Sequence, residues 1–167
     1  MSEALLRALQ QRAALNALVR RFFAERDVLE VETPILSVAG NTEPNIDSFH
    51  TDFTGHVDAG GRRRWLRTSP EYPLKRLLAA GVGDCYELGR VFRNGEAGGR
   101  HNPEFTMLEW YRAFAGAAAI MRDTEEIVVR ALSSTATLDS GTSRNAPGRS
   151  LIGSDTMTWA SSENTES

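Results

Sequence analysis

Two β-prone segments joined by a glycine-rich loop constrain the fold more than any other feature of the sequence. They run from Cys85 to Arg93 and from Glu104 to Ala113, and the loop between them covers 94–103. Two strands joined by one such connection pair most simply as an antiparallel hairpin. The sequence therefore predicts an antiparallel sheet built on this hairpin.

Strand geometry divides the side chains of this hairpin between two faces, because successive residues point to opposite sides. On the second strand, Thr106, Leu108 and Trp110 share the face that suits packing against a helix. The other face of the two strands holds Glu87, Gly89 and Arg93, and then Phe105, Met107, Glu109 and Tyr111. If these charged faces coincide, the sheet presents a polar binding surface on which Gly89 leaves room for a ligand.

Capped or amphipathic segments predict helices around this sheet. Ser2 is the predicted N-cap of a helix that reaches Arg26, with apolar residues at helical spacing. Ser69 is the predicted cap of a second helix, which starts at Pro70 and ends near Gly81. A third helix is predicted over 115–132, and short strands over 28–31, 48–54 and 64–68. The predicted fold class is therefore α+β, an antiparallel sheet flanked by helices.

Size and composition fit one principal domain. The chain has 167 residues, of which 41% are hydrophobic, and its formal net charge of −3 does not favour a nucleic-acid surface. Its single cysteine, Cys85, cannot form an internal disulfide, and no signal peptide or long apolar run is present, so we expect a cytoplasmic protein. Polar and small residues dominate after Leu132. We therefore expect a domain over 1–132 and a disordered tail over 133–167.

The polar residues of the hairpin suit a nucleotide and a cationic ligand. Arg93 can grip an α-phosphate and stabilise the charge that builds on it as pyrophosphate leaves. Phe105 can stack on adenine, and Asn102 can supply amide contacts. Glu109 with Tyr111 can hold one ammonium group, while Glu71 at a helix start can hold another.

Each of these residues also has a structural interpretation. Glu109 and Tyr111 suit a solvent-facing strand pair, Phe105 suits a core position, and Arg93 suits a structural ion pair. Taken singly, these interpretations are favoured, whereas the co-occurrence of the residues favours a binding site. His101 is interpreted as a loop hydrogen-bonding residue, and no spacing of His and Cys predicts a metal site.

Several strings of residues resemble the catalytic core of the class II aminoacyl-tRNA synthetases, in the branch that handles lysine. The resemblance is strongest from Leu66 to Tyr111, where FRN at 92–94 and RHNPEFTMLEWY at 100–111 are highly specific. The stretch VLEVETP, at 28–34, resembles the first signature of the class, which usually builds a dimer interface. The resemblance thus implies a homodimer formed through residues 5–34.

The resemblance also implies roles for individual residues. Ser69, Glu71, Glu109 and Tyr111 match positions that contact the amino-acid substrate. Arg93, Asn102 and Phe105 match positions that contact ATP, and Glu96 is carried over to the same group. The implied activity is ATP-dependent formation of an aminoacyl-adenylate, with Arg93 as the catalytic residue.

Two subfamilies of the lysine branch compete for this chain. Lysyl-tRNA synthetases carry a β-barrel ahead of the core and charge tRNA. The chain more closely resembles the stand-alone elongation factor P ligases, which transfer (R)-β-lysine to a lysine of elongation factor P; TSPEYPLKRLLAAG at 68–81 and MLEWYR at 107–112 support this. The acceptor is thus expected to be elongation factor P rather than tRNA. α-Lysine and β-lysine both remain open as substrates.

The third signature of the class is not recognisable in 133–167, nor are the acidic residues that hold Mg²⁺. We therefore expect a ligase truncated near Leu132, with an out-of-frame tail and its magnesium ligands in the missing part. A non-catalytic remnant that dimerises or binds lysine weakly is the third hypothesis.

Overall fold

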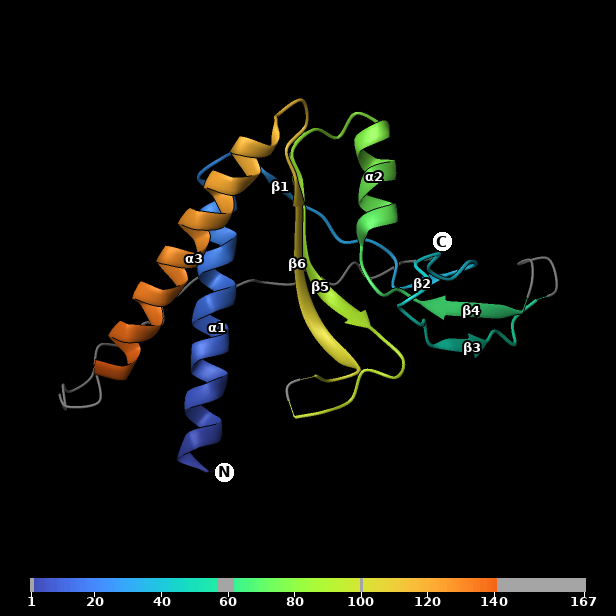
Figure 1. Cartoon of the computed structure of the whole chain (residues 1–167), viewed down its shortest axis with the longest axis horizontal. Coiled ribbons are helices and arrows are strands. Elements are labelled where there is room, and N and C mark those ends of the chain that lie inside the picture. Colours follow the sequence, from blue (N-terminus) through green and yellow to red (C-terminus); the bar gives the residue numbers. More distant parts are fainter. Residues whose placement is uncertain (1, 57–61, 100, 141–167) are drawn as a thin grey trace, which may run out of the picture.

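The computed structural model describes residues 2–56, 62–99 and 101–140. Within these ranges the chain forms helices and two three-stranded sheets (Figure 1). The elements are α1 (Glu3–Ala24), β1 (Leu29–Glu30), β2 (Leu36–Ser37), β3 (His50–Asp52), β4 (Arg63–Leu66), α2 (Glu71–Ala79), β5 (Cys85–Phe92), β6 (Glu104–Tyr111) and α3 (Ala117–Ser140). This organisation confirms the predicted α+β class.

The larger sheet has the strand order β1-β5-β6 and carries the predicted hairpin. β5 and β6 are antiparallel, and Glu87 lies directly opposite Glu109 while Gly89 lies opposite Met107. The two predicted charged faces therefore coincide, and we call this side of the sheet the Glu109 face. β1 pairs with β5 in parallel, so the sheet is mixed and not purely antiparallel as predicted.

The opposite side of the sheet, which we call the Tyr86 face, packs against α1 and α3. Figure 1 shows these two helices side by side on one side of the sheet, with α2 on the other. The core here contains Phe22 and Phe23 of α1, Tyr86 of β5 and Ile127 of α3, with Leu88, Leu108 and Trp110 packed against it. The Phe23 and Tyr86 rings stack with centroids 4.2 Å apart. The predicted packing of Leu108 and Trp110 against a helix is confirmed.

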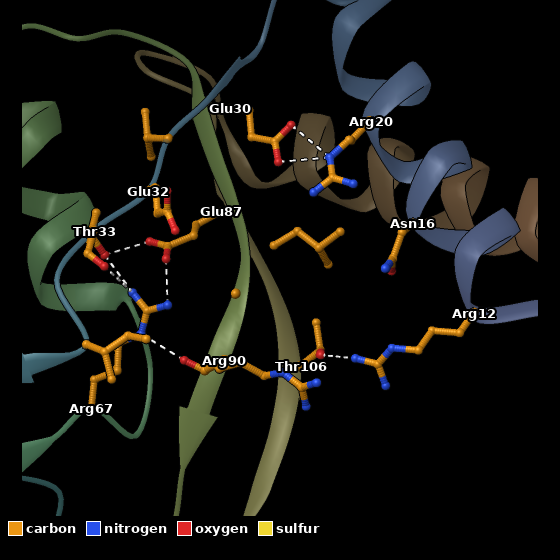
Figure 2. A pocket seen from close by; sticks show the side chains of 14 residues that line it. Arg12, Asn16, Arg20, Glu30, Glu32, Thr33, Arg67, Glu87, Arg90 and Thr106 are labelled. Carbon is orange, nitrogen blue, oxygen red and sulfur yellow. Dashed lines mark hydrogen bonds and ion pairs between the residues drawn. The ribbon is translucent and has the colours of Figure 1, made fainter. Parts of the chain in front are cut away.

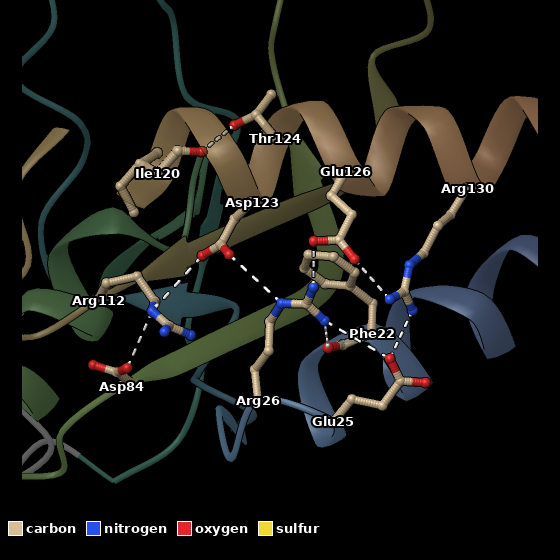
Figure 3. Close-up of polar contacts among 10 residues, drawn as sticks. All are labelled: Phe22, Glu25, Arg26, Asp84, Arg112, Ile120, Asp123, Thr124, Glu126 and Arg130. Carbon is tan, nitrogen blue, oxygen red and sulfur yellow. Dashed lines mark hydrogen bonds and ion pairs between the residues drawn. The ribbon is translucent and has the colours of Figure 1, made fainter. Parts of the chain in front are cut away.

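Ion pairs join the end of α1 to α3, as Figure 3 shows. The Arg26 guanidinium lies 2.5 Å from the Glu126 carboxylate and 3.6 Å from that of Asp123. The Arg130 guanidinium pairs with both Glu25 and Glu126, each at 2.7 Å. Together these contacts hold α3 in position across the end of α1.

α1 begins where the sequence predicts. The hydroxyl of Ser2 accepts a hydrogen bond from the Leu5 amide at 3.2 Å and so caps the first turn. The helix ends at Ala24, and Asp27 adopts a left-handed conformation (φ 54°) that turns the chain into β1.

α2 begins one residue later than predicted. Pro70 is its N-cap and Glu71 its first residue, although the Ser69 hydroxyl still accepts a hydrogen bond from the Glu71 amide at 3.0 Å. Pro73 is tolerated because the first amides of a helix have no intrahelical acceptor. The predicted end is confirmed, since Gly81 follows the helix with φ 87°.

Two elements differ more strongly from the prediction. β2 was not expected, because a two-residue strand directly after Pro34 leaves no alternating pattern; it pairs with β4 through Leu36 and Leu66. α3 continues to Ser140, beyond the predicted end of this helix at 132. The Ser133 hydroxyl donates a hydrogen bond to the Val129 carbonyl at 2.9 Å, so this polar residue can remain in the helix.

The rest of the predicted tail, 141–167, lies outside the described residues. The domain boundary at residue 132 therefore remains a prediction. Among the described helices, none combines the length and the apolar character needed to cross a membrane.

Candidate functional site

The candidate site is a cavity of about 970 Å³ over the Glu109 face. Its walls come from the Glu109 face, the start of α2, and the segment between Pro34 and Ile46. Four of the predicted site residues line it: Ser69, Glu71, Arg93 and Glu109. The fold thus brings the start of α2 and the β5–β6 hairpin to one cavity.

Glu109 lies at the centre of a hydrogen-bonded group. The Ser69 hydroxyl donates to one carboxylate oxygen of Glu109 at 2.6 Å, and the Tyr111 hydroxyl donates to the other at 2.8 Å. Burial raises the pKa of Tyr111, and its hydrogen bond to Glu109 raises the pKa further. Tyr111 therefore stays protonated at neutral pH and acts as a donor to Glu109.

Glu109 forms no direct ion pair with a cation of the described residues, although the more distant Lys75 feels its charge. Across the described ranges, no Lys, Arg or His side chain forms an ion pair with this carboxylate, and both of its hydrogen-bond donors are neutral hydroxyls. Two oriented donors fix the position of the carboxylate while leaving its net charge in place. The group is therefore suited to an ammonium group brought by a ligand.

The second predicted carboxylate, Glu71, is engaged by Lys75 one helical turn later. The Lys75 ammonium lies 2.5 Å from a Glu71 oxygen, and this hydrogen bond raises the pKa of Lys75. Both side chains are about half exposed, with exposed fractions of 56% and 46%. Exposed pairs of this spacing contribute little to stability, so a ligand can displace Lys75 from Glu71.

Arg93 directly follows β5 and lines the cavity. Its guanidinium donates to the Thr68 carbonyl at 3.4 Å and lies 3.5 Å from the Glu96 carboxylate. It also lies 5.2 Å from the centre of the Phe105 ring. Arg93, Glu96 and Phe105, all assigned to ATP by resemblance, are thus neighbours.

The remaining predicted residues lie farther from the cavity. Tyr111 contributes through Glu109, and neither Glu96 nor Phe105 lines the wall. Asn102 is exposed in the β5–β6 loop and lines neither this cavity nor the second one described below. The structure therefore groups the predicted amino-acid residues more closely than the predicted nucleotide residues.

One part of the predicted binding surface is wrong. The Glu87 carboxylate forms an ion pair with Arg67 at 2.6 Å and accepts a hydrogen bond from the Thr33 hydroxyl at 2.6 Å, and its side chain is only 2% exposed. Gly89 leaves no room for a ligand, because a Cβ there would lie 2.8 Å from Glu87 Oε1 and would clash with Arg67. The space above Gly89 is filled by the protein's own ion pair.

Arg67 connects three segments beneath the cavity and was given no role by the sequence analysis. Besides Glu87, its guanidinium donates to the Arg90 carbonyl at 2.9 Å and to the carbonyl and hydroxyl of Thr33 at 3.1 and 2.7 Å. Arg67 lies in the stretch from Leu66 to Tyr111 where the resemblance is strongest, and Thr33 lies in VLEVETP, so both stood in noted segments. Their pairing across the fold left no signal in the local pattern.

Arg76, Thr42 and Tyr72 are among the cavity-wall residues that the sequence analysis missed. Arg76 of α2 lines the cavity and is exposed. The hydroxyls of Thr42 and Tyr72 are hydrogen bonded at 2.6 Å, which ties the segment near Thr42 to α2. The segment between 40 and 46, for which the sequence predicts no helix or strand, gave no indication that it would form a wall.

No metal site is evident in the part of the chain that the structure describes. The described residues contain no group of three His, Cys, Asp or Glu side chains that could hold an ion. They therefore do not fit the Mg²⁺ that the resemblance implies.

Comparisons with known proteins find matches over most of this chain. The family model described as "tRNA synthetases class II (D, K and N)" matches residues 1–161. A protein of Yersinia enterocolitica named "Elongation factor P--(R)-beta-lysine ligase" is 52% identical over 124 residues, which cover 74% of this chain and 38% of the relative. A protein of the same name from Mannheimia succiniciproducens is 46% identical over 127 residues, covering 76% of this chain and 39% of the relative. The chain thus spans about two-fifths of the length of these curated relatives.

Proposed function

The chain belongs to the class II tRNA synthetase family of the D, K and N type, and from this premise we propose that it binds lysine or β-lysine beside ATP for activation to an aminoacyl-adenylate. The observation that carries the proposal is the Glu109 carboxylate, which neutral hydroxyls orient and which forms no ion pair with a cation of the described residues. Glu71 supplies a second carboxylate to the same cavity. Two carboxylates suit a substrate that carries two ammonium groups.

The proposed reaction begins at the α-phosphate of ATP. A carboxylate oxygen of the amino acid attacks the α-phosphorus, the bond to the β-phosphate oxygen breaks, and pyrophosphate leaves. Negative charge accumulates on the α-phosphoryl oxygens, and the Arg93 guanidinium faces the cavity where it can stabilise that charge. The Phe105 ring beside Arg93 suits stacking on adenine, while Glu96 orients the guanidinium. Asn102, which lies in the β5–β6 loop, is also proposed to contact the nucleotide.

The second step of the proposal transfers the aminoacyl group to elongation factor P. The neutral amine of an acceptor lysine attacks the carbonyl carbon of the adenylate, an amide bond forms, AMP leaves, and the amine loses a proton. The names of the similar proteins from Yersinia enterocolitica and Mannheimia succiniciproducens support this acceptor. The family description supports a second candidate, aminoacylation of tRNA with lysine.

A homodimer through residues 5–34 is part of the proposal. Large apolar side chains are exposed along this segment, with exposed fractions of 51% for Leu5, 51% for Leu9 and 54% for Leu29. Exposed apolar side chains in one segment suit burial against a second copy.

The test is lysine-dependent exchange of pyrophosphate into ATP by this chain, followed by transfer assays. We expect exchange with lysine or β-lysine, its loss in Arg93→Gln, and its retention in Glu125→Gln, an exposed carboxylate on α3. Labelling of elongation factor P without labelling of lysine tRNA supports the ligase; the reverse supports the tRNA synthetase. Binding of lysine without exchange by the folded chain would contradict both and leave a non-catalytic lysine-binding protein.

A further inference from the structure

Met107 lies in the middle of the Glu109 face, between the two groups of predicted binding residues. It shares this face with Phe105 and Glu109, because alternate residues of β6 point to the same side of the sheet. Neighbours on one face of a strand are about 6.8 Å apart along the strand. The Met107 side chain is partly buried and lines the cavity of about 970 Å³. Met107 therefore covers the stretch between Glu109 and the residues assigned to ATP.

The Arg67–Glu87 pair bounds the cavity floor beside Met107. Met107 lies opposite Gly89 in the β5–β6 register, and the pair fills the space above Gly89. Figure 2 shows the Arg67 guanidinium joined to Glu87 and Thr33 beside a second cavity, of about 650 Å³, between α1 and the larger sheet. Arg67 lines both cavities. Because Glu87 matches the charge of Arg67, this part of the floor offers a ligand no unpaired charge.

Met107 differs in chemistry from the binding residues on either side of it. Glu109 carries a negative charge and Arg93 a positive one, whereas the Met107 thioether is at most a weak hydrogen-bond acceptor. A polar ligand group over Met107 would lose its hydrogen bonds to water without replacing them. Methylene groups, in contrast, are stabilised when they leave water for an apolar side chain. The middle of the floor is therefore suited to an aliphatic chain.

The two ends of such a chain are set by the proposed function, on which this inference rests. One ammonium group of the substrate pairs with Glu109, which Ser69 and Tyr111 hold in place, and the carboxylate group reaches toward the α-phosphate beside Arg93. We propose that Met107 binds the methylene groups between these ends and makes the site selective for the chain length of lysine. β-Lysine has the same number of carbons between its terminal ammonium and its carboxylate, so Met107 accepts both. Ornithine is one methylene group shorter and covers less of Met107.

Calorimetric titration of the chain with lysine and with ornithine, which carry the same charges, tests the proposal. We expect the unmodified chain to bind lysine at least about fourfold more tightly, which is the contribution of one buried methylene group. Met107→Gln keeps the length of the side chain but makes its end polar, and we expect the ratio of the two affinities to fall below about twofold. The matched control, Met121→Gln, makes the same change at a residue of α3 that is 70% exposed, and the affinity ratio is expected to stay unchanged.

Two further variants separate this role from general damage to the cavity, which would weaken the binding of lysine and ornithine equally. Met107→Leu keeps an apolar side chain of similar volume, and we expect the preference for lysine to be recovered. Glu109→Gln removes a charge that contacts both ligands, so both are expected to bind more weakly while the ratio of their affinities is kept.

An unchanged affinity ratio in Met107→Gln would overturn the proposal. Equal affinities of the unmodified chain for lysine and ornithine would also overturn it, and that measurement requires no variant to fold. Lysine binding that depends on Glu109, with an affinity ratio indifferent to Met107, would leave the proposed function standing and overturn only the role of Met107. No binding of lysine by the folded chain would overturn both.

Discussion

Glu87 and Glu109 are the same residue type, lie directly opposite each other on one face of one sheet, and have different surroundings. Glu87 is paired with the Arg67 guanidinium and with Thr33, and its side chain is almost fully buried. Glu109 accepts hydrogen bonds from Ser69 and Tyr111, both neutral, and faces a cavity.

The difference lies in what compensates each negative charge. An internal cation neutralises Glu87. Its carboxylate therefore joins β5 to two other segments, the one that precedes Pro34 and the one that precedes α2. Neutral donors hold Glu109 in place but leave its charge available. The kind of partner, and not burial alone, thus distinguishes a structural carboxylate from one suited to bind a ligand.

The largest effect is expected from Glu87→Gln, which leaves the buried Arg67 guanidinium without its counter-charge. Removing one partner of a buried pair costs about 3–5 kcal/mol. Glu109→Gln keeps an oxygen that accepts hydrogen bonds, so we expect a change in unfolding free energy below about 1 kcal/mol. Urea unfolding of both variants measures the difference. Equal losses of stability would show that the two carboxylates have the same role.

Gly89→Ala tests whether the Arg67–Glu87 pair fills the space above the sheet. The added methyl group has to displace that buried pair, and overpacking of this kind costs about 1–3 kcal/mol. The control is Gly98→Ala in the β5–β6 loop, where a Cβ meets nothing within 4 Å. A Gly89→Ala protein as stable as the control in thermal unfolding would contradict the claim that the Arg67–Glu87 pair fills the space above Gly89.

Tyr111→Phe removes one of the two neutral donors to Glu109. Loss of one such hydrogen bond is worth about 1 kcal/mol, so we expect lysine affinity to fall about fivefold. Tyr72→Phe, which removes a hydroxyl bonded to Thr42, is the control for loss of a phenolic hydroxyl on the same cavity wall. Equal effects of the two substitutions on lysine binding, measured by calorimetry, would contradict the claim that the Tyr111–Glu109 hydrogen bond contributes specifically to lysine binding.

The smallest effect concerns the α1–α3 contact, far from either carboxylate. Hydrogen bonds from Arg26 and then Arg130 lower the pKa of Glu126 below its usual 4.5. Between the folded and unfolded pKa values the unfolded chain binds more protons, so the stabilisation is present above about pH 4.5 and is lost as the pH falls through the folded value. Glu126→Gln should therefore flatten the acid limb of the stability curve slightly. An unchanged acid limb would show that the exposed pair contributes nothing.

Alternation along β5 and β6 was enough to predict which residues share the Glu109 face, because that pattern is local to each strand. It could not predict which carboxylate a cation would reach, since Arg67 and Thr33 arrive from separate segments of the chain. The position of Ser69 followed from its helix-start pattern, but its bond to Glu109 depends on how α2 packs on the sheet. The polar composition after Leu132 did not indicate that α3 continues there. A serine can remain in the helix because its hydroxyl donates to a backbone carbonyl one turn earlier, as Ser133 does. The assigned roles of Ser69, Glu71, Glu109, Tyr111, Arg93, Glu96, Asn102 and Phe105 remain predictions.

Calorimetric titration of the chain with lysine tests the role of Glu109 most directly. We predict that Glu109→Gln weakens binding at least about tenfold, because it removes the negative charge that pairs with one ammonium group of lysine. Its free energy of unfolding changes by less than about 1 kcal/mol, and the control Glu125→Gln binds lysine as tightly as the unmodified chain. Lysine binding of equal strength in Glu109→Gln and the unmodified chain would contradict the account.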